Sequence, residues 1–153
     1  MQISSPVFDD RGNIPPKYTC DGEDISPPLK ISNIPTEAKS LAIVVDDPDA
    51  PGGIFDHWTI WNISTKFTKI PENIPEGDKV DSLNGAIQGK NGFGEIGYRG
   101  PCPPPGPDHK YRFKLYALKD KIDLNPGVLK KDLERKIKGL VVKKDQITGL
   151  YDR

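Results

Sequence analysis

The sequence predicts a β-sandwich or barrel-like domain, an all-β fold, with one peripheral helix near the C-terminus. Three observations support this fold class. The chain has 15 Gly and 16 Pro among 153 residues, so turns and loops must take a large share of it. Between the turns lie short runs of β-branched and aromatic residues, which are typical of strands. Only one segment has apolar residues at helical spacing. The length fits a single domain, residues 1–153.

The clearest strands are expected in the middle of the chain. Ser40–Asp46 is a compact apolar run, as in a central strand buried on both faces. His57–Ile63 is aromatic and β-branched, and Tyr111–Leu118 begins with alternating apolar and charged residues. Weaker signals indicate further strands at Leu29–Ile31, Leu140–Lys143 and Gln146–Tyr151. The polar, Gly-rich stretch Pro71–Tyr98 predicts an extended surface segment with one short strand around Ala86–Gln88.

The single helix is expected at Val128–Lys138. Its apolar residues recur at spacings of 4, 4 and 3 and form one stripe: Leu129, Leu133, Ile137 and Leu140. Asn125 and Pro126 are typical of a helix start, and Gly139 is typical of a helix end. One amphipathic face of this kind packs against a sheet, so the helix is expected to lie at the edge of the β-domain.

Charge and composition exclude several classes of protein. The 22 basic residues balance 22 acidic ones, so nothing favours a nucleic-acid partner. No apolar run approaches the roughly 18 residues of a membrane span, and residues 1–10 lack the pattern of a secretory signal. We therefore expect a cytoplasmic protein with no membrane span. No cofactor is expected, and no metal, because the two cysteines and two histidines lack zinc-ligand spacing.

The two histidines indicate where chemistry could occur. His57 and His109 each begin or precede a predicted strand, and each follows a loop rich in Pro and Gly. Stiff loops need little ordering when a ligand binds. With Asp47, Asp49 and the Tyr111 hydroxyl, the imidazoles could surround a small anion, and the carboxylates would orient the rings or favour their charged form.

Other interpretations of these residues stay open. A backbone N–H near Gly100 could add a donor to the anion site, but each histidine could also be an ordinary structural residue beside common turn sequences. An enzyme could use Asp47, His57 and His109 as general acid and base on a phosphoester or acyl group. No Gly-x-Ser-x-Gly motif supports such a hydrolase. A protein-interaction domain with an incidental pocket is a third alternative.

Two sequence blocks resemble those of the phosphatidylethanolamine-binding protein family, also called the Raf kinase inhibitor protein family. The first block is DPDAP at 47–51 with His57-Trp58 leading into WNI at 61–63, and the second is GYRGPCPP at 97–104 with Gly106 and HKYRF at 109–113. The similarity to the short bacterial and archaeal branch extends to both ends of the chain, through residues 4–8, 18–22, 25–29 and 149–151.

The resemblance implies two antiparallel sheets with a small anion pocket at one end. Carried over to this sequence, the pocket residues are Asp47, Asp49, His57, Gly100, Pro101, His109 and Tyr111, with Phe55 at the rim. Family members bind phosphate-type head groups, and several inhibit serine proteases or regulate kinases. No catalytic turnover is common to the family. The resemblance therefore implies a binding protein, not an enzyme, for a small anionic or phosphorylated ligand. A serine protease or kinase partner and a homodimer are further expectations.

Four further expectations concern details of this pocket. Lys110 stands where arginine is common, which removes a bidentate contact. The sequence ends at Arg153 without the C-terminal helix that covers the pocket in animal members, so a more open pocket is expected. The tight turn and the resemblance both favour a cis peptide bond at Ala50-Pro51. Cys20 and Cys102 are expected to lie close together, either as a disulfide or as two free thiols.

Overall fold

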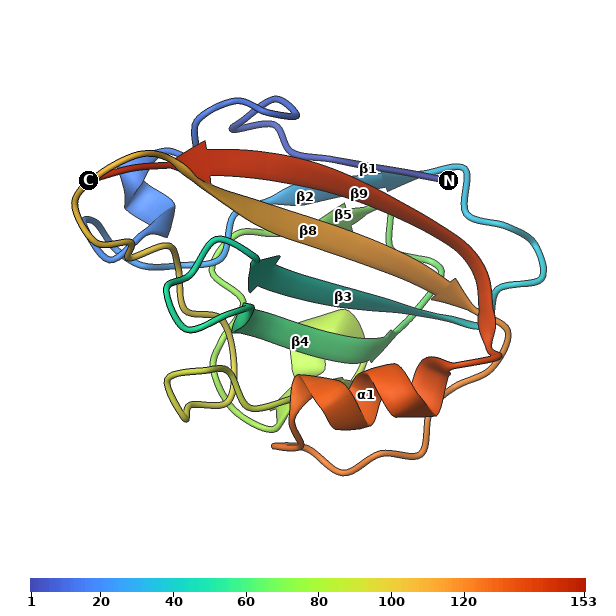
Figure 1. Cartoon of the computed structure of the whole chain (residues 1–153). Coiled ribbons are helices and arrows are strands. Elements are labelled where there is room, and N and C mark those ends of the chain that lie inside the picture. Colours follow the sequence, from blue (N-terminus) through green and yellow to red (C-terminus); the bar gives the residue numbers. More distant parts are fainter.

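The computed structural model describes all residues, 1–153, and consists mainly of strands in two antiparallel sheets, with one α-helix near the C-terminus (Figure 1). The smaller sheet has the order β1 (Gln2–Ser4), β2 (Leu29–Ser32), β5 (Lys69–Ile70). The larger sheet has the order β6 (Lys79–Val80), β7 (Ala86–Gln88), β4 (Phe55–Ile63), β3 (Ser40–Asp47), β8 (His109–Leu118), β9 (Val141–Tyr151). The predicted fold class is confirmed.

The main core fills the space between the two sheets. Every residue of β3 is buried, as expected for a central strand. Leu41, Ile43 and Val45 belong to the main core, where they pack in one cluster with Ile3 and Ile31 of the smaller sheet. Since successive side chains of a strand point to opposite faces, the intervening residues of β3 must be buried on the other side of the larger sheet.

The helix α1 (Lys130–Ile137) covers part of that outer face. Leu133 and Ile137 pack in a second cluster with Ala42, Val44 and Trp61. Leu133, Ile137 and Leu140 of the expected apolar stripe pack in this way, whereas Leu129 is the N-cap residue and is 43% exposed. Two apolar faces on one sheet explain why the chain needs a helix outside its sandwich.

The helix starts later than its sequence signals indicate. Its N-cap is Leu129, not Asn125, and Asp132 accepts a hydrogen bond from the Leu129 N–H at 3.2 Å. The preceding segment is tied to the end of β7 instead, because the Gly127 N–H donates to the Gln88 carbonyl and Val128 accepts from the Lys90 N–H. The predicted stop at Gly139 agrees with its φ of +85°.

The last strand is one continuous element instead of the two that were expected. Strand β9 pairs with β8 from His109↔Tyr151 to Leu118↔Val141. It is the edge strand of its sheet, and its charged stretch around residues 143–145 faces solvent on one side. Charged residues protect an exposed edge from pairing with other chains, so they do not mark a break here. No helix of the structure combines the length and apolar character that crossing a membrane requires.

The short elements β1, β5 and β6 were not expected. Each has only two or three residues, too few to show a period in the sequence. Two single-turn 3-10 helices, η1 (Pro16–Tyr18) and η2 (Asp81–Leu83), complete the structure. The polar segment between residues 71 and 98 is therefore more ordered than its composition suggests.

Candidate functional site

A cavity of about 150 Å³ lies at one end of the larger sheet. It is lined by residues from the end of β3, the starts of β4 and β8, and three loops: Asp47, Ala50, Pro51, Phe55, His57, Phe93, Cys102, Pro103, Pro104, His109 and Tyr111. The sheet order explains this meeting. Since β3 runs antiparallel to both neighbours, its last residue lies beside the first residues of β4 and β8.

Asp47 holds the His109 ring in place. The His109 Nδ1–H donates to Asp47 Oδ2 at 2.7 Å, and both side chains are buried. The second oxygen of the carboxylate accepts the Asp49 backbone N–H at 2.8 Å. A carboxylate can only accept, so Nδ1 carries a proton and Nε2 is the ring nitrogen that stays free for a ligand.

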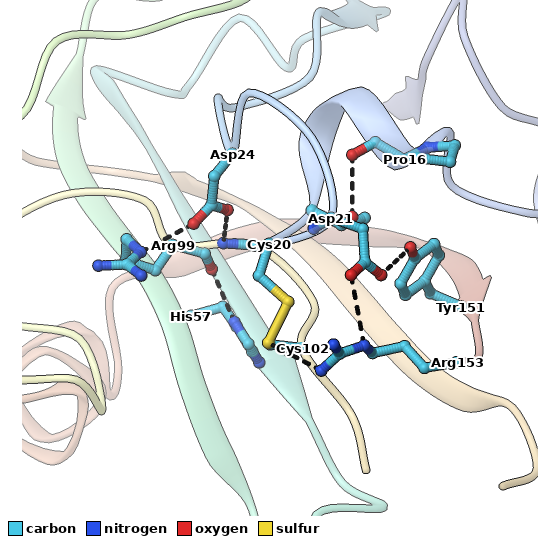
Figure 2. The surroundings of a disulfide bond; sticks show 11 residues. Pro16, Cys20, Asp21, Asp24, His57, Arg99, Cys102, Tyr151 and Arg153 are labelled. Carbon is cyan, nitrogen blue, oxygen red and sulfur yellow. Dashed lines mark hydrogen bonds and ion pairs between the residues drawn. A yellow bond between two sulfur atoms is a disulfide. The ribbon is translucent and has the colours of Figure 1, made fainter. Parts of the chain in front are cut away.

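His57 is held in the same way by a backbone carbonyl. Its Nδ1–H donates to the Arg99 oxygen at 2.7 Å, and Figure 2 shows the other ring nitrogen pointing away from Arg99. Burial lowers the pKa of His57 below its usual value, against the opposing effects of the Arg99 hydrogen bond and the Asp47 charge. At neutral pH the ring is therefore neutral, with Nε2 as an acceptor.

The Tyr111 ring lies beside both imidazoles. Its ring lies edge-on to His57, with centroids 5.3 Å apart, and stacks with His109 at 6.4 Å. Burial, followed by the charge of Asp47, raises the pKa of the Tyr111 hydroxyl well above its usual value. The hydroxyl therefore keeps its proton at every physiological pH; it lies within hydrogen-bonding range of Asp47, and a bound anion would be an alternative acceptor.

Two phenylalanines form the rim of the cavity. The Phe55 and Phe93 rings meet edge to face at 4.9 Å, and Phe93 is 45% exposed. Phe55 can lie against the chain because residue 92 is glycine, where a Cβ would come within 2.5 Å of the ring. The Arg99 guanidinium lies 5.1 Å from the centre of Phe93. Phe93 was missed in the sequence, although an isolated phenylalanine between two glycines in a polar segment is a usable signal.

A disulfide joins the cavity wall to the loop around Cys20 (Figure 2). The Cys20 and Cys102 Cα atoms are 5.4 Å apart, so the expected proximity is confirmed. Of the two alternatives, a disulfide or two free thiols, the structure has the disulfide. The Cys20 N–H also donates to the Pro101 carbonyl, and the Arg153 guanidinium donates to Cys102 Sγ at 3.5 Å. The wall thus has both a covalent and a polar attachment.

Five of the eight residues carried over from the family pattern line the cavity: Asp47, Phe55, His57, His109 and Tyr111. Asp49, Gly100 and Pro101 do not. Asp49 Oδ2 accepts the Lys110 N–H at 2.8 Å and so braces the loop instead.

The expected backbone donor near Gly100 is already used by the protein. The Gly100 N–H donates to Asp24 Oδ1 at 2.7 Å. A Cβ at residue 100 would come within 2.2 Å of the Tyr18 carbonyl oxygen, so glycine is needed there for close packing. The structure therefore gives Gly100 a packing role.

The expected cis peptide at Ala50-Pro51 is wrong, since every peptide bond is trans. The turn is closed by other means. The Gly53 N–H donates to the Ala50 carbonyl at 3.1 Å, and Gly53 adopts a φ of +110° that favours glycine. The Asp49 N–H donates to the Asp47 carboxylate, and this hydrogen bond holds the Asp47 side chain toward the cavity.

The lining contains few groups for covalent chemistry. It has no serine or threonine, and its one cysteine is in the disulfide. No cluster of three or more His, Cys, Asp or Glu side chains is arranged to hold a metal ion.

Two packed antiparallel sheets with a cavity at one end place this chain in a class of small β-sandwich proteins. Comparison with known proteins then assigns the family. The model of the phosphatidylethanolamine-binding protein family matches residues 4–152. This chain belongs to the phosphatidylethanolamine-binding protein family.

Individual relatives agree with this assignment. A UPF0098 protein of Pyrococcus horikoshii is 51% identical over all of this chain and 77% of its own length, and one of Methanothermobacter thermautotrophicus is 48% identical over 100% and 99%. Among solved structures, Escherichia coli YbcL, described as a member of the mammalian family, has a TM-score of 0.92 at 32% identity, covering 99% of this chain and 98% of its own. A family homologue from Chlamydia trachomatis has a TM-score of 0.90 at 37% identity, covering 99% and 97%.

Proposed function

We propose that the cavity binds a small anionic or phosphorylated ligand between His57, His109 and Tyr111, with Asp47 as the residue that positions His109. One observation carries the proposal. Both imidazoles have Nδ1 fixed by a protein acceptor, at 2.7 Å in each case, so both present Nε2 to a ligand. Groups held in place before binding lose little entropy when the ligand arrives.

The cavity volume limits the ligand to a head group. About 150 Å³ corresponds to about five water molecules at roughly 30 Å³ each. A phosphate or phosphate monoester group fits this space, whereas a complete lipid does not. Any larger part of a ligand would extend past Phe55 and Phe93 at the rim, and their rings would contact its apolar portion.

The protonation states supply a specific test of the proposal. A neutral His57 presents only a lone pair at Nε2, so a dianion binds well only if the ring gains a proton. Because burial lowers the pKa of His57, that proton must be taken up on binding near neutral pH. We therefore expect tighter binding as pH falls toward about 6.5, until the ligand's own pKa of about 6 limits the gain.

Calorimetric titration with inorganic phosphate and with phosphoethanolamine tests this ligand class. His57→Ala and His109→Ala should each weaken binding about ten- to a hundredfold, because each removes one charged hydrogen bond worth about 1.5–3 kcal/mol. Repeating the titration in buffers of different ionisation enthalpy measures the proton uptake. Lys66→Ala, an exposed charge change away from the cavity, is the matched control. Equal affinities in the wild type and both histidine variants would refute the proposal.

The proposal extends to partners and location. An inhibitory role toward a serine protease or a kinase and a homodimeric state follow from the family resemblance, and inhibition assays and light scattering test them. A cytoplasmic location is tested by the redox state of the Cys20–Cys102 pair in intact cells, because a reducing cytosol keeps most thiols reduced. No observation of the structure favours the alternative hydrolase, and product release from the phosphate ester in the same titrations would revive it.

A further inference from the structure

A second cavity lies on the outer face of the larger sheet. It has a volume of about 360 Å³ and is lined by Arg112, Lys114, Tyr116, Lys144, Asp145 and Gln146, which we call the outer-sheet groove. In Figure 1, α1 lies in front of the larger sheet near β4 and leaves β8 and β9 uncovered. Cross-strand pairs Lys114↔Gln146 and Tyr116↔Lys144 place these side chains on one face. That face is opposite to the one on which Tyr111 and the histidine pocket lie.

The groove is built on a buried carboxylate. Asp46 is fully buried, and its oxygens accept hydrogen bonds from Arg112 Nε at 2.7 Å and Lys114 Nζ at 2.9 Å. Lys130 Nζ of α1 adds a third contact at 3.2 Å. One negative charge therefore holds three cations, and only Lys130 has a second carboxylate, Asp56, at 2.9 Å. The cations outnumber the anions that hold them.

Most donors of these cations have no protein acceptor. Asp46 occupies only the Nε–H of Arg112, so the terminal N–H groups of its guanidinium remain unpaired. Lys114 uses one of its N–H groups on Asp46, and Lys144 makes no hydrogen bond or ion pair. Asp145 is the one carboxylate of the lining, and its Oδ2 accepts the Ile3 N–H at 2.9 Å. Of the three cations in the lining, Arg112 and Lys114 share the single charge of Asp46 beneath them, and Lys144 has no partner.

The spacing of the cations indicates the kind of ligand. The charged groups of Arg112 and Lys114 converge on Asp46, at 2.7 and 2.9 Å from its two oxygens. Lys144 lies one rung further, opposite Tyr116. One phosphate group cannot contact all three, but two linked phosphates can. The groove volume corresponds to about twelve water molecules, which also suits a diphosphate. The planar guanidinium fork of Arg112 matches the oxygens of such a group.

We propose that the outer-sheet groove is a second anion-binding site, separate from the histidine pocket, for a small ligand with two linked oxyanion groups. Asp46 acts as the positioning residue that holds Arg112 and Lys114 with their free donors toward the ligand. One oxyanion group of the ligand lies near Arg112 and Lys114, and the second reaches along the groove to Lys144, opposite Tyr116.

Titration with inorganic pyrophosphate tests the second site, using a variant that carries both His57→Ala and His109→Ala to remove the first one. Pyrophosphate should still bind this variant, and at least tenfold more tightly than inorganic phosphate does. Loss of binding in the double variant would assign pyrophosphate to the histidine pocket and overturn the proposal. Equal affinity for the two probes would overturn the requirement for two linked groups.

A pair of neighbouring lysines provides a matched control for charge. Lys144→Ala should weaken pyrophosphate binding about five- to tenfold. Lys143→Ala, the same change on the opposite face of β9, should leave it unchanged. Amide shifts of residues 112–116 and 144–146 should move during the titration. Equal losses in the two lysine variants would show unspecific attraction and refute the site. Both variants change exposed residues, so they should fold normally.

Discussion

Replacing Asp46 with asparagine should destabilise the protein more than any other change of a carboxylate to an amide. Asp46 is 0% exposed, and it accepts from Arg112, Lys114 and Lys130. Asparagine keeps the shape of the side chain but loses its charge and one acceptor. The three cations then remain close together without the anion that compensates them.

The magnitude follows from the contacts and their exposure. Three charge-assisted hydrogen bonds at about 1.5–3 kcal/mol each set an upper limit near 5–9 kcal/mol. The side chains of Arg112 and Lys114 are 27% and 18% exposed, so water recovers part of their hydration after the substitution. Lys130 keeps Asp56 at 2.9 Å. We therefore expect a loss of about 3 kcal/mol, at the lower end of the range for a broken buried pair.

Urea unfolding measures this loss directly. With a slope of about 2 kcal/mol per molar urea, the midpoint of Asp46→Asn should fall by about 1.5 M. The control is Glu23→Gln, which changes a side chain that is 66% exposed and lies 3.9 Å from Lys17, and it should cost less than about 0.5 kcal/mol. A loss below about 1 kcal/mol for Asp46→Asn would refute the reasoning that the cations depend on this carboxylate.

The pH dependence of the difference provides an independent check. Burial alone would raise the pKa of Asp46, but the hydrogen bonds from Arg112 and Lys114 and the nearby lysine charges lower it below its usual 3.8. A carboxylate with a lowered folded pKa stabilises the protein above its unfolded pKa of about 3.9 and loses this effect as pH falls through the folded value. The difference between wild type and Asp46→Asn should be constant above pH about 5 and shrink below pH about 4.

Three further predictions concern the histidine pocket and its wall. Changing both Cys20 and Cys102 to serine should lower stability by up to roughly 4–5 kcal/mol, because the bridge spans 82 residues, and thermal unfolding with and without reductant should show the same loss. Gly92→Ala should cost about 1–3 kcal/mol and move the Phe55 ring, which fluorine labelling of phenylalanine detects; an unchanged ring signal would contradict the contact. Nuclear magnetic resonance should show His57 titrating below the usual 6.5, so that its protonation lowers stability as pH falls below that value; a raised pKa would contradict its burial.

The elements that could be predicted from the sequence are those whose own residues decide their structure. Strands β3, β4 and β8 carry enough apolar or alternating residues to be located within two residues of their bounds. Strands β1, β5 and β6 could not be found, because partners across the sheet define them. The sequence also did not predict that β9 is continuous. Its lysines at 143 and 144 are exposed at the edge of the sheet, so they interrupt the apolar pattern without interrupting the strand.

The candidate site was also predicted only in part. The two histidines after stiff loops indicated the residues at the starts of β4 and β8, and the antiparallel sheet brings these residues and the end of β3 to one cavity. Gly100 was carried over from the family pattern and expected near a backbone donor for the anion, but its N–H donates to Asp24 and the Tyr18 carbonyl leaves no room for a Cβ there. Phe93 belongs to a loop whose course depends on Asn91, which accepts the Phe93 N–H and donates to the Gly97 carbonyl. The local signal that the sequence offered for Phe93 was its position between Gly92 and Gly94.

The bridge between Cys20 and Cys102 also turns more than half of the chain into a covalent ring. Strands β2 to β7 lie inside this ring, whereas β8 and β9, which complete the same six-stranded sheet, lie outside it. A protease that cuts once between residues 21 and 101 therefore releases no fragment from the oxidised protein. The pieces separate only after reduction, so a cut in the exposed loop near Phe93 is silent on a non-reducing gel.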